Sequence, residues 1–412
     1  MFNKPLAVSF AVAAVLGGLG IGTALADDIP LPTIGGRIYT DISNIKQQNS
    51  DKDTSNSGTG VDVKRFYLIL NEKFNDMWST KMETDATYNS VTASTCKGSG
   101  ATLTCTTGTT SQQVNLYFKN VYLQMTLDPG FWVRLGEFDT PWIPFVEGIY
   151  NHRYVENEIT DRLKFGSSAD WGLSIGGDLL DKALSYQIAA IEGNGYKNPT
   201  RTKTMDVEGR VDYQIGGFTL GIGGYEGKLG QEKYGNTVTL TTVTGTTTTT
   251  TSVPQTYRTA TQVDALLAYV GNGARVGVEY FEAKNWTNGI SGSSDVPELT
   301  STDSPNPADK ADGESVFASY DFTPMWGVFG RYDNAKLSKD LASDLKDKYF
   351  DVGLEAHPYN MYKKNIDVAL VYKHEKMDGG PTGSTFSTAN GSAFNEADGK
   401  YDEVGIWAQV NF

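Results

Sequence analysis

Sixteen segments of alternating polar and apolar residues run through the chain, and the connections between them are alternately short and long. An alternation with a period of two predicts β-strands that have one apolar and one polar face. The predicted strands cover residues 33–44, 62–71, 78–88, 113–127, 131–138, 169–177, 183–191, 204–213, 217–224, 259–270, 274–284, 315–322, 326–334, 348–356, 365–373 and 400–412. An even strand count, with short turns at one end and long loops at the other, is typical of a closed transmembrane barrel.

The closing segment, Lys400 to Phe412, shows the alternation clearly. Every second residue from Val404 to Phe412 is apolar, whereas the opposite face holds Glu403 and Gln409. The pattern alone would also fit an edge strand of a soluble sandwich. A terminal phenylalanine on the apolar face of a closing strand resembles the assembly signal of bacterial outer-membrane barrels. We therefore expect Phe412 to be read by the barrel assembly machinery.

Large aromatic residues are found beside the predicted short turns. They are Phe74, Trp78, Phe131, Trp132, Tyr213, Phe218, Phe322 and Trp326. Aromatic side chains form girdles at the two interfaces of a membrane barrel, whereas a soluble sandwich has no reason to sort them this way. The sequence therefore predicts an all-β fold, a 16-stranded antiparallel transmembrane β-barrel with short periplasmic turns and long external loops.

Residues 1–26 have the features of a secretory signal peptide. The single charge of Lys4 precedes an apolar run from Leu6 to Ile21, and Ala24-Leu25-Ala26 matches a small-x-small cleavage site. A membrane anchor is a poorer interpretation, because glycines interrupt the run and a spanning helix needs about 20 continuous apolar residues. We expect residues 27–412 to form one barrel domain in the outer membrane of a Gram-negative bacterium.

The charge balance is acidic. The formal net charge is −14, and loss of Lys4 with the signal makes it −15 (−14 minus +1). Such a balance excludes nucleic acid as a partner, since nucleic-acid binding needs a basic surface, and it attracts cations. The mean hydropathy of −0.35 fits a barrel, because only alternate residues of its strands face lipid.

Two cysteines, Cys96 and Cys105, flank a Ser/Thr/Gly-rich octet in a predicted loop. In an exported protein such a pair predicts a disulfide. The spacing offers neither the histidines nor the second cysteine pair of a zinc site. We expect no metal site and no cofactor.

A sixteen-stranded barrel is too wide for side chains to fill, so the sequence predicts a water-filled channel. The acids predicted to face the lumen are Asp41, Glu83, Asp85, Asp206, Glu208, Asp212, Asp264, Glu279, Asp333, Asp351, Glu355, Asp367 and Glu403. The bases are Arg37, Arg65, Lys81, Arg134, Arg210, Arg275, Arg331 and Lys373. Rings of charged side chains set pore selectivity, so this excess of acids predicts a weak cation preference. Alternatively, the acids pair with the bases and leave a small net field.

The long connection from Asp139 to Ser168 differs from the other loops, because it contains five aromatic residues and mixed charge. Apolar content in a loop indicates packing, so we expect this segment to fold into the lumen and narrow the pore. The alternative is an external loop that packs on its neighbours. The predicted constriction charges are Arg134, Asp139, Glu147, Arg153, Glu156, Glu158, Asp161, Arg162 and Lys164.

Three stretches resemble the phosphate-selective porin O and P family: VKRFYL from Val63 to Leu68, VYL from Val121 to Leu123, and the long run from Val133 to Gly177. The most specific part is LGEFDTP, Leu135 to Pro141, which resembles the family's fifth strand and the start of its constriction loop. The resemblance covers about the first half of the predicted mature chain. It implies a sixteen-stranded homotrimeric porin, and some members select phosphate through a ladder of arginines and lysines. Here inward bases are outnumbered, so no phosphate-binding residue is carried over.

Other classes of function have less support in the sequence. Barrel enzymes need a histidine beside a carboxylate and a hydroxyl or amide residue, whereas His152, His357 and His374 fall on a loop, a turn and a strand end. A barrel that sheathes a redox protein would need a haem from another chain, since no CxxCH motif is present. We expect small ions or solutes, outer-membrane lipid and lipopolysaccharide as partners.

Overall fold

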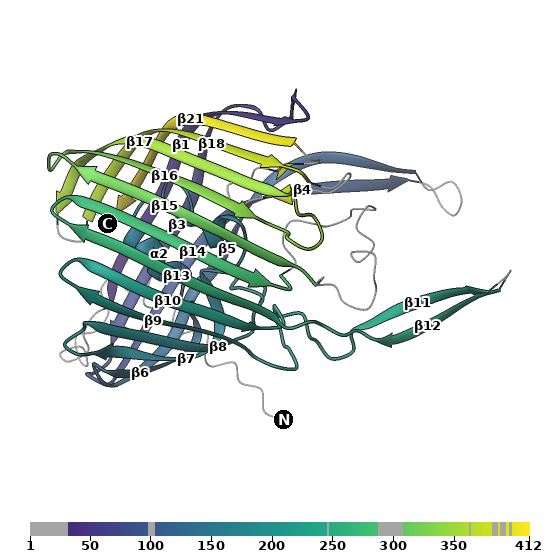
Figure 1. Ribbon diagram of the computed structural model, residues 1–412, viewed down its shortest axis with the longest axis horizontal. Helices are drawn as coiled ribbons and strands as arrows, with labels where there is room; N and C mark the ends of the chain where they lie inside the picture. The colour runs from purple at the N-terminus through teal and green to yellow at the C-terminus, as the bar shows by residue number, and fades with distance from the viewer. Residues whose placement is uncertain are drawn as a thin grey trace, which may run out of the picture.

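The computed structural model describes residues 32–97, 104–244, 247–286, 308–361, 364–380, 386–387, 393–394 and 398–412. The predicted signal peptide, 1–26, lies outside these residues. The described chain forms a closed antiparallel barrel of sixteen strands (Figure 1). The barrel closes where the first strand pairs with the last, with Ile38 opposite Val410.

The sixteen strands follow one another around the barrel in chain order. They are β1 (Thr33–Asn49), β3 (Gly58–Lys73), β4 (Trp78–Lys97), β5 (Thr104–Asp128), β6 (Phe131–Asp139), β7 (Ala169–Leu179), β8 (Leu184–Ile191), β9 (Asp206–Ile215), β10 (Phe218–Gly227), β13 (Ala260–Gly271), β14 (Ala274–Lys284), β15 (Lys310–Asp321), β16 (Trp326–Lys336), β17 (Lys346–Met361), β18 (Lys364–Asp378) and β21 (Asp398–Asn411). All sixteen predicted strands are confirmed.

Several strands run further than their sequence pattern indicated. The predicted cysteine loop is largely the continuation of β4 and β5, whose backbone register places Cys96 opposite Cys105. The side chains of this part lie outside the described residues, so the disulfide stays a prediction. The long connection between the predicted strands 217–224 and 259–270 is rich in threonine, and part of it forms a hairpin of its own, β11 (Thr237–Thr244) with β12 (Thr247–Pro254). Threonine is β-branched and favours extended backbone, which explains why these low-complexity segments pair.

Three short strands complete the set of described strands. They are β2 (Lys52–Asp53), which pairs with β1, and the pair β19 (Phe386–Ser387) with β20 (Ala393–Phe394). In Figure 1 the long β4–β5 hairpin and the β11–β12 hairpin project from the same end of the barrel, the end of the long loops. Among the described residues, no helix is both long and apolar enough to cross a membrane.

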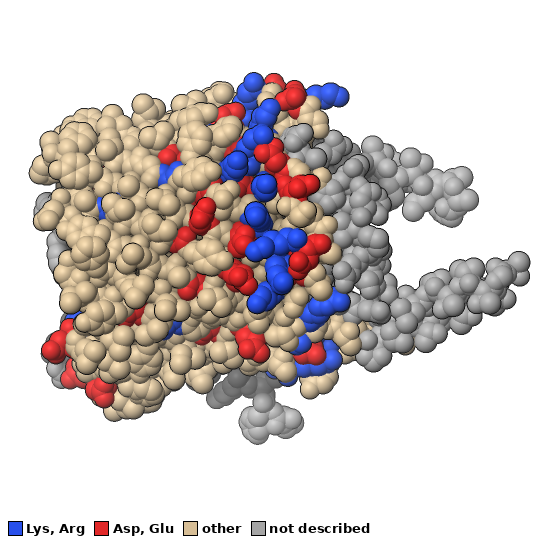
Figure 2. Space-filling model, viewed as in Figure 1, with Lys and Arg blue, Asp and Glu red and all other residues tan. Residues whose placement is uncertain are grey.

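The outer surface of the barrel is apolar. On β10, Phe218, Leu220 and Ile222 are each more than half exposed, whereas Thr219, between them, is buried. On the face shown in Figure 2, the short-turn half of the barrel is a broad and largely uncharged band, and most of the visible charged side chains gather toward the long loops. Apolar surface exposed to water costs about 25 cal/mol per Å², so this band fits a surrounding apolar phase.

Candidate functional site

The segment between β6 and β7 contains two short helices, α2 (Ile143–Tyr150) and α3 (Ile159–Arg162). Proline in the first turn favours the start of α2, and Asn151 ends it in the left-handed conformation, with a φ of 67°. Glu158 caps α3, because its carboxylate accepts hydrogen bonds from the backbone N–H groups of Thr160 at 2.7 Å and Asp161 at 2.6 Å. Alternation along the strands could not predict these helices.

Arg162 anchors the end of this loop to the barrel wall. Its side chain is fully buried and donates to Asp333 at 3.0 Å, to Asp347 at 2.5 Å and to Glu375 at 2.7 Å. These acids come from the adjacent strands β16, β17 and β18, and the guanidinium also lies over the ring of Tyr349 at 4.5 Å. One arginine therefore holds three strands by charge-assisted hydrogen bonds.

The middle of the loop is bound to the same side of the wall. Glu355 of β17 accepts from His152 at 3.1 Å and from the Tyr154 hydroxyl at 3.2 Å. Lys373 of β18 donates to the carbonyl oxygen of Val155 at 2.6 Å and lies 3.3 Å from Glu403 of β21. The loop backbone and side chains thus both contribute to the attachment.

The start of the loop is attached to a different group of strands. Trp142 donates from its backbone to Glu208 of β9 and from its indole to Glu279 of β14, each at 3.0 Å. Glycines make room for this contact, because a Cβ at Gly223 of β10 would lie 2.5 Å from the Trp142 ring. Arg275 of β14 donates to the carbonyl oxygen of Ile149 at 2.8 Å.

Three apolar clusters join the loop to the wall around most of the barrel. Ile159, Leu163 and Phe165 pack with Phe281, Leu345 and Met377; Tyr154 and Val155 with Tyr39, Tyr67, Phe329 and Trp407; and Trp142, Val146 and Tyr150 with Leu266 and Phe317. The wall residues belong to β1, β3, β13, β14, β15, β16, β18 and β21, and Leu345 directly precedes β17. The predicted loop from Asp139 to Ser168 therefore lies inside the barrel.

Charges within the loop are also paired and buried. Arg153 lies 2.9 Å from Glu147 and 3.7 Å from Asp161. Burial raises the pKa of Glu147 to about 8, although Arg153 opposes this shift. Burial, together with the charge of Asp161, raises the pKa of Glu158 to about 7. These carboxyl groups titrate within the range of ordinary buffers.

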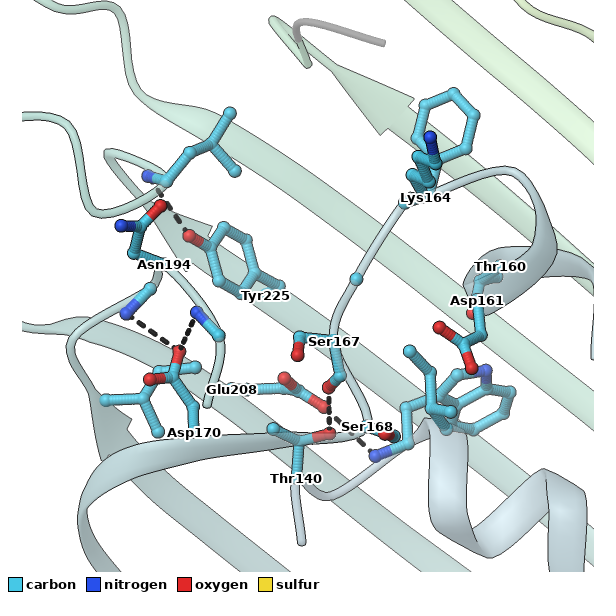
Figure 3. Close-up of a pocket in the computed structure, with 18 of the residues that line it drawn as sticks. Thr140, Thr160, Asp161, Lys164, Ser167, Ser168, Asp170, Asn194, Glu208 and Tyr225 are labelled. Carbon is cyan, nitrogen blue, oxygen red and sulfur yellow. Dashed lines mark hydrogen bonds between the residues drawn. The ribbon is translucent and has the colours of Figure 1, made fainter. Parts of the chain in front are cut away.

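A cavity of about 570 Å³ lies between the loop and strands β7 to β10 and β13. Its charged lining residues are Arg65, Asp161, Lys164, Asp170, Lys197, Glu208 and Asp264, and its aromatic ones are Trp142, Phe165, Tyr196, Tyr225 and Trp286. Figure 3 shows Asp170 and Glu208 on one side and Asp161 and Lys164 on the loop across from them. At the three apolar clusters described above, by contrast, the loop packs directly against the wall.

Backbone groups hold part of the cavity rim. Asp170 accepts hydrogen bonds from the N–H groups of Gly193 at 2.9 Å and Gly195 at 3.1 Å, which fixes the connection between β8 and β9 (Figure 3). Lys197 follows on this connection and lies over the ring of Tyr196 at 5.3 Å. Burial lowers the pKa of Lys197 to about 8.

The predicted constriction residues occupy several environments. Asp139 accepts from Asn120 at 3.1 Å and lies 3.7 Å from Lys81. Glu156 lies 3.4 Å from Lys373. Arg134 is on β6, where it donates to Gln124 at 2.7 Å and stacks over Trp132 at 4.0 Å.

Many predicted wall acids are ion-paired. The pairs are Asp41 with Lys64 at 3.1 Å, Glu83 with Lys81 at 2.5 Å, Asp85 with Arg65 at 2.8 Å, Asp212 with Arg210 at 3.0 Å and Asp333 with Arg331 at 2.5 Å. Arg37 instead donates to Asn411 at 2.7 Å. This pairing favours the alternative expectation that the wall has a small net field.

Sequence reasoning missed several residues that hold the loop or line the cavity. Asp347 and Glu375 lie just outside the predicted strands 348–356 and 365–373, although each continues the alternation of its strand, Asp347 with Asp351 and Glu375 with Lys373. His357 is also within β17 rather than in a turn. Lys119 is buried because an irregularity in the β4–β5 pairing interrupts the alternation, which no pattern of period two could indicate.

Comparisons with solved structures agree with this architecture. The chain is similar to an anion-selective porin from Comamonas acidovorans, with 12% identity and a TM-score of 0.54 over 92% of this chain and 99% of that one. It is also similar to the outer-membrane protein OmpT of Vibrio cholerae, with 14% identity and a TM-score of 0.53 over 95% and 100%. OmpF of Salmonella typhi, solved with daunomycin, gives 13% identity and a TM-score of 0.52 over 95% and 100%.

These likenesses show the fold alone, the closed sixteen-stranded barrel. No family model matches the chain, and no curated protein matches it.

Proposed function

We propose that this protein is an outer-membrane porin, a barrel through which small ions and hydrophilic solutes diffuse passively. The observation that carries the proposal is the charged cavity that remains between the loop and the wall of a barrel with an apolar outer surface. Backbone groups in lipid must be satisfied internally, and a closed barrel satisfies them all. The porin neighbours support the same interpretation by fold.

The permeation path proposed here runs through the cavity beside the loop. Its lining contains four acids and three bases, which supports a weak preference for cations. A phosphate-selective or otherwise anion-selective channel, as in some members of the phosphate-selective porin O and P family, is the competing outcome. The sequence resemblance to that family supports common ancestry, and we propose no phosphate-binding residue from it.

A planar bilayer measurement tests the pore and its path. We expect measurable ion conductance across the bilayer and a reversal potential in a KCl gradient that indicates a weak cation preference. Phosphate in the bath should not block the current. Asp161→Asn should shift that potential toward anions and Lys197→Gln toward cations, because both side chains line the cavity. The exposed Arg201→Gln serves as the control. Absence of conductance would refute the pore, and equal potentials in all variants would refute the path.

The assembly of the protein belongs to the same proposal. We propose a homotrimer embedded in outer-membrane lipid and lipopolysaccharide, inserted by the barrel assembly machinery through the signal of Phe412. A trimeric form of the similar Vibrio cholerae OmpT supports the oligomeric part, at a TM-score of 0.50. Passive diffusion requires no catalytic group, so we propose no enzymatic activity.

A further inference from the structure

Three ligand-type side chains converge at the short-turn end of the barrel. They are Asp321 at the end of β15, and Glu355 and His357 on β17. His357 Nε2 lies 3.4 Å from Asp321 Oδ1 and 3.9 Å from Glu355 Oε1. All three ligand atoms lie within 4.8 Å of one another, and this group is the only such cluster among the described residues.

The distances match the edges of a small coordination sphere. Zinc binds imidazole nitrogen and carboxylate oxygen at about 2.0–2.2 Å, so tetrahedral ligands lie about 3.3–3.6 Å apart. The 3.4 Å distance between His357 Nε2 and Asp321 Oδ1 falls in this range, and the 3.9 Å distance between His357 Nε2 and Glu355 Oε1 needs only a small contraction. Because Asp321 is about half exposed, its carboxylate can move to close the site.

A further carboxylate lies on the opposite side of the His357 ring and can orient it as a ligand. His357 Nδ1 lies 2.7 Å from Asp367 of β18. A carboxylate at one ring nitrogen fixes a proton there and directs the other nitrogen's lone pair outward, which is the arrangement found around most metal-bound histidines. In this protein the outward nitrogen faces Asp321 and Glu355.

The backbone around His357 is also shaped locally. The β17–β18 register shifts between Ala356 and Tyr359, so the segment His357-Pro358 forms a bulge. A bulge re-aims side chains, and proline removes a backbone donor from the ladder. The His357 N–H donates to the Met325 carbonyl oxygen at 2.9 Å, which fixes the histidine beside the turn that follows β15.

We propose that Asp321, Glu355 and His357 form a binding site for a divalent transition-metal ion of the zinc type, with solvent completing the coordination. A mixed nitrogen and carboxylate set favours such ions over Mg²⁺, which prefers oxygen ligands and retains its water. Arg275 interacts electrostatically with Asp321 and Glu355, and its positive charge lowers the affinity of the site for a cation. The site is open to solution through the exposed Asp321.

Metal binding to the untagged protein in detergent tests the proposal, with ZnCl₂ titrated by calorimetry in the presence of millimolar Mg²⁺. We expect one saturable Zn²⁺ per chain, and an affinity at least tenfold lower in His357→Ala and Asp321→Asn. His374→Ala is the matched control. His374 also pairs with an aspartate, Asp402 at 2.8 Å, but it lies on the part of β18 near the long loops, away from the proposed site. That variant should bind as tightly as the wild type.

Three results would overturn the site. The first is the absence of saturable Zn²⁺ binding to the wild type, and the second is binding by Asp321→Asn and His357→Ala with unchanged affinity. The third is loss of binding in His374→Ala alone, which would assign the ion to that histidine. Heat-modifiable migration on gels verifies that each variant is folded. If His357→Ala does not fold, Asp321→Asn still tests the site, because Asp321 is at an exposed position.

Discussion

At the scale of single residues, the inner loop depends on buried charges that lie against buried partners of opposite sign. Arg162 illustrates this, since its side chain has no exposed surface and meets three carboxylates. Removal of one partner from such a buried group leaves the remaining charges without compensation, which costs more than the pair itself contributes. Substitutions here therefore act on the seating of the loop as well as on local charge.

Replacement of Arg162 by glutamine should loosen the loop. The variant leaves Asp333, Asp347 and Glu375 buried without their common cation, which we expect to destabilise the loop by about 3–5 kcal/mol. Thermal unfolding in detergent should show a lower transition temperature, and single channels should become noisier. The exposed Arg201→Gln should change neither property. Unaltered channels and stability in Arg162→Gln would contradict the anchoring role.

The seating of the loop should also depend on pH through Glu147. Its pKa, about 8 in the folded protein, is raised by burial above the ordinary glutamate value. The stability that protonation contributes is fully present below about pH 4, and it is lost as the pH rises through 8. Channel noise should therefore increase between pH 5 and 9. Glu147→Gln should reduce this dependence, and an identical pH profile in that variant would exclude Glu147 as its source.

At the scale of elements, strands were predictable because burial on one side imposes a period of two on the sequence. The strand ends toward the long loops could not be predicted, because the residues there are mostly polar on both faces, as in the stretch from Lys373 to Asp378. The inner position of the loop was indicated by its aromatic residues. The residues that anchor the loop could not be predicted, because Arg162 contacts acids that lie 171, 185 and 213 residues further along the chain.

The β11–β12 hairpin should be dispensable for the barrel. It forms a separate two-stranded sheet, and the backbone N–H of Gln255 donates to the carbonyl oxygen of Asn236 at 3.0 Å, so the two ends of the hairpin are adjacent. Replacement of residues 237–254 by a short Gly-Ser linker should leave the thermal transition and the conductance unchanged. A barrel that fails to fold after this deletion would show that the hairpin contributes to stability.

At the scale of the whole molecule, the apolar exterior and the charged interior divide every barrel strand between two environments. Val278, near the middle of β14, is about half exposed on the outer face, and its neighbour Glu279 is buried inside. The same substitution therefore has opposite effects on the two faces of one strand, because a charge suits the inner face and an apolar side chain suits the outer face.

An arginine on the outer face should disturb insertion. Val278→Arg places a charge in the apolar band, which costs about 2–4 kcal/mol near the middle of a bilayer. Folding into phosphatidylcholine vesicles, followed by heat-modifiable migration, should show a clear loss of folded protein. Val278→Leu keeps the surface apolar and should fold like the wild type. Equal folding of both variants would place Val278 away from lipid.

The position of Arg162 in the chain also sets an order of events during assembly. The arginine is synthesised long before the acids of β16, β17 and β18, and its partners come together only when those last strands have paired. Contacts of such large sequence separation form late. Earlier strands can hold the start of the loop through Trp142, but the end of the loop at Arg162 is secured only after β16, β17 and β18 have joined the barrel. Seating of this arginine therefore requires that these three strands lie side by side in the correct order.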